Sequence, residues 1–170
     1  MDIISHGLYG GIALGRKKRK DYIFAFILSI VPDIFAEGIM FILIFIGVKG
    51  MPSLEHGHPN ITELPVYAQN FYNTTHSLII FILVFIFIWI VRKRPYWILL
   101  VWGIHVIIDI PTHSYDLFPT PFLWPISNFK INGISWDRPI VMIINISILL
   151  IVYAIWILKS KRLKYFKINN

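Results

Sequence analysis

Long apolar stretches alternate with short basic clusters along this chain of 170 residues. The apolar stretches cover residues 22–48, 78–91, 95–110 and 139–158. A helix needs about 20 mostly apolar residues to cross a bilayer, with about 17 as the lower limit. The last stretch meets that length, the second and third are marginal, and the first is longer than one span requires. We expect Pro32 to break or kink the first stretch, because proline removes a backbone hydrogen bond inside a helix.

A shorter apolar segment precedes the first basic cluster. Asp2 is of a residue type that often caps helices, so we expect a short helix over residues 3–15. Such a helix is only about 20 Å long, which is too short to span a bilayer. Gly7, Gly11 and Gly15 recur every four residues and predict close packing of this helix on another one.

The composition supports a membrane protein. Apolar residues make up 56% of the chain and charged residues 15%, whereas globular domains have about 45–50% and about 25%. These values exclude a disordered chain and an ordinary soluble domain. Cysteine is absent, so disulfides and thiolate metal sites are excluded, and a metal ion would need His, Asp or Glu ligands.

Three basic clusters hold thirteen of the sixteen Lys and Arg residues, and they cover residues 16–20, 92–94 and 159–167. If all three clusters lie in the cytoplasm, as the positive-inside rule favours, the four apolar segments run alternately outward and inward through the bilayer without conflict. The long connections at 49–75 and 111–138 then lie outside. Topology thus accounts for the net charge of +7, and we expect no nucleic-acid partner. We predict a single all-α domain over residues 1–170, a polytopic inner-membrane bundle of about four long helices plus a short N-terminal helix.

Ionisable side chains interrupt the apolar segments at similar depths. They are His6, Asp33, Glu37, His76, His105 and Asp109. Counting about 1.5 Å per helical residue from the nearest basic cluster places the histidines and aspartates about 15–24 Å deep. Polar groups inside a bilayer are costly and indicate a functional site by default. We therefore expect one shared site between mid-membrane and the outer face.

His105 and Asp109 are four residues apart and would lie on one face of a helix. The pair could chelate one ion, or the carboxylate could orient the imidazole as a metal ligand. Simpler interpretations stay open. The pair could form a purely structural hydrogen bond, and Asp33 could compensate for the proline kink. His6 and His76 could be interfacial residues that bind no ion.

Further features lie toward the predicted outer face. The proline after Asp109 should end its helix, which places His113 at the outer mouth. Glu37, His113 and Asp116 are our candidates for the general base or acid. The aromatic, proline-rich segment 118–125 is predicted to be a loop at headgroup level. We interpret the Glu and His residues of 55–58 as an exposed loop.

Several of these motifs occur together in a characteristic order. They are His6 near the start, Pro32-Asp33, Thr75-His76-Ser77, His105-x-x-x-Asp109-x-x-Thr112 and Leu123-Trp124-Pro125. The set, which covers most of the chain, resembles the YdjM-type membrane-bound metal-dependent hydrolases, described as LexA-regulated inner-membrane proteins. The resemblance implies these metal ligands: His6, Asp33, His76, His105 and Asp109. The chain departs from the pattern at Phe35, where many members have a second acidic residue, and at Phe71-Tyr72, where many have His-Arg. These departures would leave fewer ligands.

The predicted function combines the membrane and metal arguments. Imidazole and carboxylate ligands without thiolates favour Zn²⁺ as the divalent ion, with Mn²⁺ or Fe²⁺ as alternatives. We predict a membrane-embedded hydrolase that uses metal-activated water on a lipid or lipid-linked (phospho)ester at the outer leaflet. A distant resemblance to zinc-dependent phospholipase C implies phosphodiester chemistry by fold analogy. Membrane lipids are expected partners, and the oligomeric state stays open. The alternative is a non-catalytic membrane protein or an ion or proton transporter with intramembrane His and Asp.

Overall fold

The computed structural model describes residues 1–168 except 49, 51–52, 56–57 and 60–64; its description excludes the side chains at 37, 39–40, 43, 54–55, 58–59 and 161–168. The described chain is almost entirely helical. Its elements are α1 (Ile3–Leu14), α2 (Arg19–Asp33), the π-helix η1 (Ile34–Gly38), α3 (Ile39–Phe45), α4 (Val66–Thr75), α5 (Leu78–Arg92), the 3₁₀-helix η3 (Trp97–Leu99), α6 (Leu100–Thr112) and α7 (Pro139–Ile168). Two short strands, β1 (Leu54–Glu55) and β2 (His58–Pro59), pair antiparallel. The predicted all-α class is confirmed, and the interpretation of 55–58 as an exposed loop falls partly outside the described residues.

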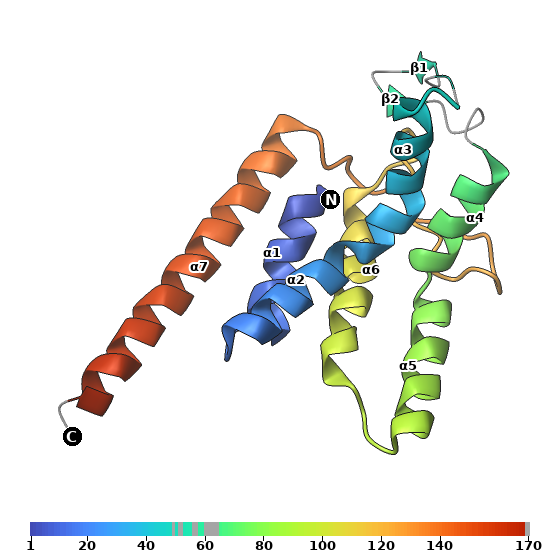
Figure 1. Cartoon of the computed structure of the whole chain (residues 1–170). Helices are drawn as coiled ribbons and strands as arrows, with labels where there is room; N and C mark the ends of the chain where they lie inside the picture. Colours follow the sequence, from blue (N-terminus) through green and yellow to red (C-terminus); the bar gives the residue numbers. More distant parts are fainter. Residues whose placement is uncertain (49, 51–52, 56–57, 60–64, 169–170) are drawn as a thin grey trace.

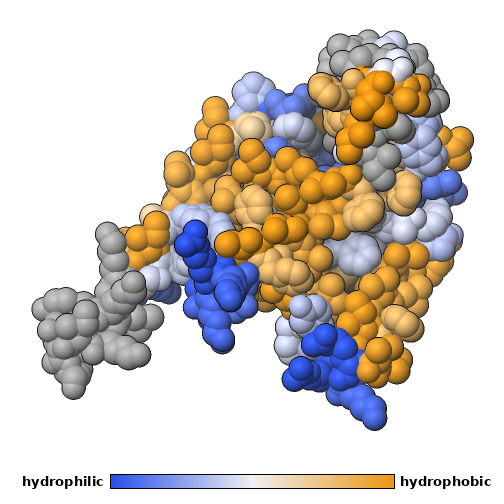
Figure 2. Space-filling model, viewed as in Figure 1, coloured by the Kyte–Doolittle hydropathy of each residue, from blue (hydrophilic) through white to orange (hydrophobic). Residues whose placement is uncertain are grey.

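The helices run alternately between two ends of the molecule (Figure 1). Helix α1 descends from the N-terminus, and α2, η1 and α3 rise together beside it. Helices α4 and α5 descend, α6 returns, and α7 descends on the other side of α1. The start of α2, the end of α5 and the end of α7 therefore lie at one end. Near the first two of these, Figure 2 shows hydrophilic groups projecting below a broad hydrophobic surface. These directions are the ones that the apolar segments and basic clusters predict.

Helix α1 packs closely on α2 through its glycines. A Cβ added at Gly7 would lie 2.5 Å from the Phe26 ring, and one at Gly11 would lie 2.6 Å from the Tyr22 ring. At Gly15 the clash would be with backbone, 2.3 Å from the Tyr22 Cα. Only glycine permits this approach, so the packing role predicted from the four-residue spacing is confirmed.

Two helix boundaries differ from the expected pattern. Pro32 lies inside α2, which ends at Asp33 and continues into η1, so the predicted break is wrong and a local distortion takes its place. The wider π-helical turn follows the position where proline lacks its N–H, a usual cause of local helix distortion. The connection predicted over 49–75 contains a further helix, α4, which meets α5 at an angle of 62°. Ser77, at this junction, caps α5 by accepting a hydrogen bond of 3.2 Å from the Ile80 N–H.

Within the described chain, one helix is long and apolar enough to cross a membrane, or two if the bent α4–α5 pair forms one span. The first is Pro139–Ser160 of α7, with a mean hydropathy of 2.7 over its best window. Only 11% of that window is buried, so most of its apolar side chains face outward. Helix α5, with 15 residues, and α6, with 13, are shorter than the predicted long helices.

Candidate metal centre

Four ionisable side chains from distant parts of the chain converge inside the bundle. Asp33 ends α2, His76 lies between α4 and α5, and His105 and Asp109 lie on α6. One possible ligand atom from each residue lies within 4.8 Å of the other three. The two histidines and Asp109 are at most 1% exposed. The predicted shared site therefore exists as a buried cluster, which we call the four-residue cluster.

The spacing of the cluster atoms matches a tetrahedral ion site. His105 Nε2 lies 3.2 Å from His76 Nε2 and 3.1 Å from Asp109 Oδ2. Asp33 Oδ1 lies 3.2 Å from His76 Nε2 and 3.4 Å from His105 Nε2. Asp109 Oδ2 and His76 Nε2 are 3.6 Å apart. Four ligands at Zn²⁺ distances of about 2.0–2.1 Å in a tetrahedron are about 3.3–3.4 Å from one another. Five of the six separations thus lie close to the value that such a site requires.

Backbone carbonyl groups determine which imidazole nitrogen faces the cluster. His105 Nδ1 lies 2.8 Å from the Ser29 carbonyl oxygen. His76 Nδ1 lies 3.2 Å from the carbonyl oxygen of Tyr72. A carbonyl oxygen can only accept, so each Nδ1 carries the hydrogen and donates it. In the neutral rings, both Nε2 atoms therefore present lone pairs to the cluster, which is the usual arrangement of histidine ligands.

The cluster thus brings imidazole lone pairs and carboxylate oxygens together without enough hydrogen atoms to form hydrogen bonds between them. Asp33 Oδ2 and Asp109 Oδ2 are buried and have no hydrogen-bond partner within the described part of the chain. A buried carboxylate oxygen without a partner is strongly unfavourable. A cation between the two carboxylates and the two imidazole lone pairs would pair Asp109 Oδ2 and neutralise both carboxylates. The residues present therefore fit a divalent metal ion.

His6 lies next to the four-residue cluster. Its Nε2 donates to Asp109 Oδ1 at 2.8 Å, and its ring centroid is 3.8 Å from that of His105. The Met1 amine donates to the same Asp109 oxygen at 2.6 Å. His6 was predicted as a metal ligand, and the structure places it where it holds the Asp109 carboxylate in position.

The three candidate acid–base residues have different surroundings. His113 is buried, and its Nδ1 lies 3.3 Å from Asp109 Oδ1. Asp116 is exposed in the loop after α6 and is not brought to the cluster. Glu37 lies in η1, but its side chain is outside the described part. Of the two whose side chains the structure describes, His113 is the one that it brings to the site.

A pocket of about 310 Å³ adjoins the cluster. Asp33 and His113 form part of its wall. The other lining residues are mostly apolar or aromatic: Met1, Asp2, Ile3, Ile34, Gly38, Phe41, Tyr72 and Trp136. The pocket therefore connects the polar cluster with a mainly apolar surface.

Some contributors to the site carry no recognisable sequence signal. Ser29 and Tyr72 act through backbone carbonyl groups, which every residue type has. Trp102 donates from Nε1 to the Thr75 carbonyl at 2.6 Å and so ties α6 to the segment that carries His76. The Tyr72 ring stacks on His76 at a centroid distance of 4.1 Å. Only the aromatic character of Tyr72 and Trp102 beside polar motifs could have drawn attention to them.

No protein-family model, curated protein or solved structure matches this chain. The fold and the cluster define a helical protein with a buried His/Asp group that could hold a metal ion.

Proposed function

We propose that this chain is a membrane-embedded, metal-dependent hydrolase. The ion, most suitably Zn²⁺, would be held by Asp33, His76, His105 and Asp109. The observation that carries the proposal is the convergence of two imidazole lone pairs and two carboxylates, with five of the six separations between 3.1 and 3.6 Å and all of them within 4.8 Å. Neutral imidazole with carboxylate suits zinc better than larger oxygen-preferring ions, and water would reach the ion from the pocket beside Asp33.

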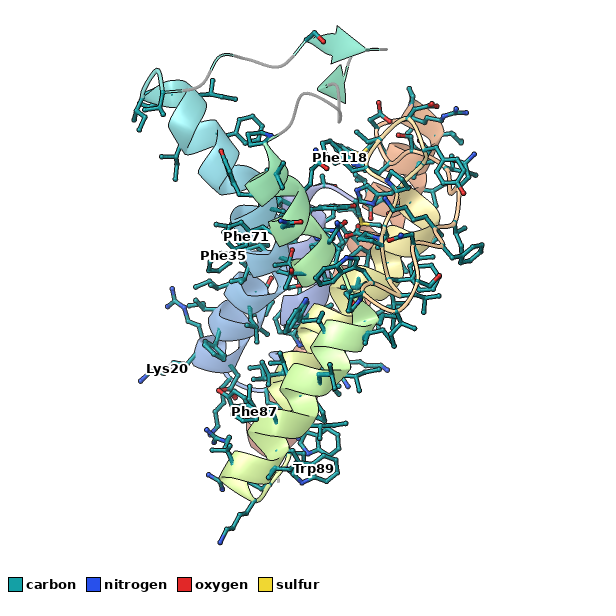
Figure 3. The ribbon with its side chains drawn as sticks, turned by 90° about the vertical axis from the view of Figure 1, so that its right-hand side faces the viewer. Lys20, Phe35, Phe71, Phe87, Trp89 and Phe118 are labelled. Carbon is teal, nitrogen blue, oxygen red and sulfur yellow. The ribbon has the colours of Figure 1, made fainter. Side chains whose placement is uncertain are left out.

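A single ion accounts for the residues around the site. Phe35 and Phe71, at the two places where the chain departs from the YdjM-type pattern, have ring centroids 6.5 Å apart, and Figure 3 shows them side by side. Neither ring carries a metal-binding atom, so the chain supplies fewer ligands for a second ion. This arrangement supports one ion rather than two.

The neighbouring residues would have separate roles in positioning a ligand, transferring a proton and meeting the substrate. When bound, Zn²⁺ would supply a Lewis acid and lower the pKa of water toward about 7. His6 holds Asp109 through its hydrogen bond of 2.8 Å. His113 lies between the pocket and Asp109 and would carry a proton to or from the pocket. Asp33 is the one cluster residue that lines the pocket, so a substrate would meet the site on its side.

The pocket favours a substrate with an apolar part. Ile3, Ile34 and Phe41 line it together with Trp136, which comes from the loop between α6 and α7. A lipid or lipid-linked ester would place its polar bond near Asp33 and His113 and its chain along this apolar wall.

The membrane arrangement we propose follows the helix directions. The four helical segments built from α2–η1–α3, α4–α5, η3–α6 and α7 would cross or enter the inner membrane. The basic clusters would lie in the cytoplasm and the pocket toward the outer side. The outward-facing apolar side chains of α7 support this arrangement, because an exposed apolar face of this size suits lipid.

Metal content and turnover together test the proposal. The full chain, purified in detergent, should contain close to one Zn²⁺ per chain by elemental analysis. His105→Ala and Asp109→Ala should lose the ion, whereas Asp116→Ala, an exposed control, should keep it. Hydrolysis of a short-chain phosphatidylcholine or of bis-p-nitrophenyl phosphate should require the ion. Metal-free wild type, or equal metal in all variants, would refute the site; bound metal without turnover would favour the non-catalytic alternative.

A further inference from the structure

A second pocket lies at the opposite, basic end of the molecule. It has a volume of about 750 Å³ and lies between the end of α1, the start of α2, and the connection from α5 to η3. Its charged lining residues are Lys20, Asp21, Arg92 and Arg94. Three cations against one carboxylate leave a net positive pocket. Figure 3 shows Lys20 at the same end of the molecule as Phe87 and Trp89 of α5.

The local backbone brings the two arginines to this pocket. Lys93 ends α5 in the left-handed conformation, with φ 55° and ψ 16°. This turn reverses the chain direction, so that both Arg92 and Arg94 line the pocket although they come before and after the turn. The Arg92 guanidinium carbon lies 4.5 Å above the Tyr96 ring centroid, a cation–π contact that holds its side chain.

The rest of the lining has the character of a membrane interface. Tyr96 and Trp97 line the pocket, and these residue types concentrate at the headgroup level of bilayers. Leu14, Phe24 and Ile98 continue the wall as an apolar surface. Guanidinium groups bind phosphate oxygens through paired hydrogen bonds, and basic pockets between membrane helices bind anionic headgroups.

We propose that this pocket binds the phosphate headgroup of an anionic phospholipid, with an acyl chain along the apolar wall. The cations would contact the phosphate, and Trp97 would lie at the level of the glycerol. The site uses none of the residues of the metal centre. A failure of the metal-dependent activity would therefore not affect this lipid site, and the reverse also holds.

Lipid retention by the purified full chain tests this site. In neutral detergent, native mass spectrometry should show phosphatidylglycerol bound at least about tenfold more tightly than phosphatidylcholine, because only the former carries net charge. The Arg92→Gln/Arg94→Gln double variant should bind phosphatidylglycerol about thirtyfold more weakly, the effect of two cations near an anionic lipid. Lys17→Gln/Lys18→Gln, the control, removes the same charge from outside the pocket lining and should change affinity by less than about twofold.

Three results would overturn the proposal. Equal weakening in the two double variants would mean that the attraction is diffuse and no specific site exists. Equal affinity for the two lipids would remove the headgroup charge from the recognition. Displacement of phosphatidylglycerol by millimolar inorganic phosphate would show that free phosphate is the ligand. Circular dichroism of both variants checks that each retains its helices, and because the substituted side chains are exposed, both should.

Discussion

Replacing Asp109 by Asn tests the metal centre with the smallest possible change in shape. Asp109 provides the oxygen that lies 3.1 Å from His105 Nε2, and its other oxygen accepts from His6. The amide keeps the volume of the side chain but removes the negative charge that a cation would neutralise. Changes outside the ligand set already weaken metal binding by about 10–100-fold, so loss of a charged ligand should weaken it by about 100-fold or more.

The expected effect on thermal stability follows from this affinity. At a free Zn²⁺ concentration of 100 times the Kd, binding stabilises the wild type by about 2.7 kcal/mol. For a chain of this size, 1 kcal/mol corresponds to about 2–4 °C in Tm, so Zn²⁺ should raise the Tm by about 5–11 °C. At the same concentration, the Asp109→Asn variant should gain only about 0.4 kcal/mol, or about 1–2 °C.

The assay is thermal unfolding of the full chain in detergent, with either EDTA or Zn²⁺. Asp116→Asn is the matched control, because it makes the same chemical change on an exposed carboxylate away from the cluster. The control should keep the full Zn²⁺-dependent shift. If the wild type melts at one temperature in both solutions, or if Asp109→Asn keeps the whole shift, the reasoning about the four-residue cluster is wrong.

Three further changes test the packing, the orientation and the acid–base role. Gly15→Ala should lower stability by about 1–3 kcal/mol in thermal unfolding, since its Cβ would lie 2.3 Å from α2 backbone. Gly50→Ala, where a Cβ meets no described residue within 4 Å, should leave the Tm unchanged. Because the chain has no cysteine, Ser53→Cys and Ser160→Cys can each be labelled in intact cells; an impermeant reagent should modify the first and spare the second, and the reverse would contradict the topology. His113→Gln should retain Zn²⁺ but lower hydrolysis by about 100-fold, a typical contribution of general acid–base catalysis; unchanged turnover would exclude that role.

The polar residues of the site could be found from the sequence because of where they occur. Asp33, His105 and Asp109 interrupt apolar segments, and an ionisable group there is costly unless it has a partner. Counting along helices also gave their depth, because the rise per residue is constant. These two facts predicted a common level for the site before any contact was known.

Which of these residues touch one another could not be predicted in the same way. His6 and His76 are both buried histidines at similar depth, yet His76 joins the cluster and His6 holds Asp109 from the side. The difference depends on how α1 packs on α2 and on the bend between α4 and α5. Local periodicity predicts neither the α1–α2 packing nor the α4–α5 bend, since both arise from contacts between residues far apart in the chain.

The sequence by itself determined the helical class, the directions of the apolar segments and the close packing of the first helix on another one, which the structure identifies as α2. Each depends on local composition: apolar length, the placement of cations, or the absence of a Cβ at Gly7, Gly11 and Gly15. The tertiary structure alone decided the metal geometry, the Nδ1–carbonyl contacts that orient His76 and His105, and the two pockets. These features depend on separations of a few ångströms between distant segments, which only the packing of the whole bundle can fix.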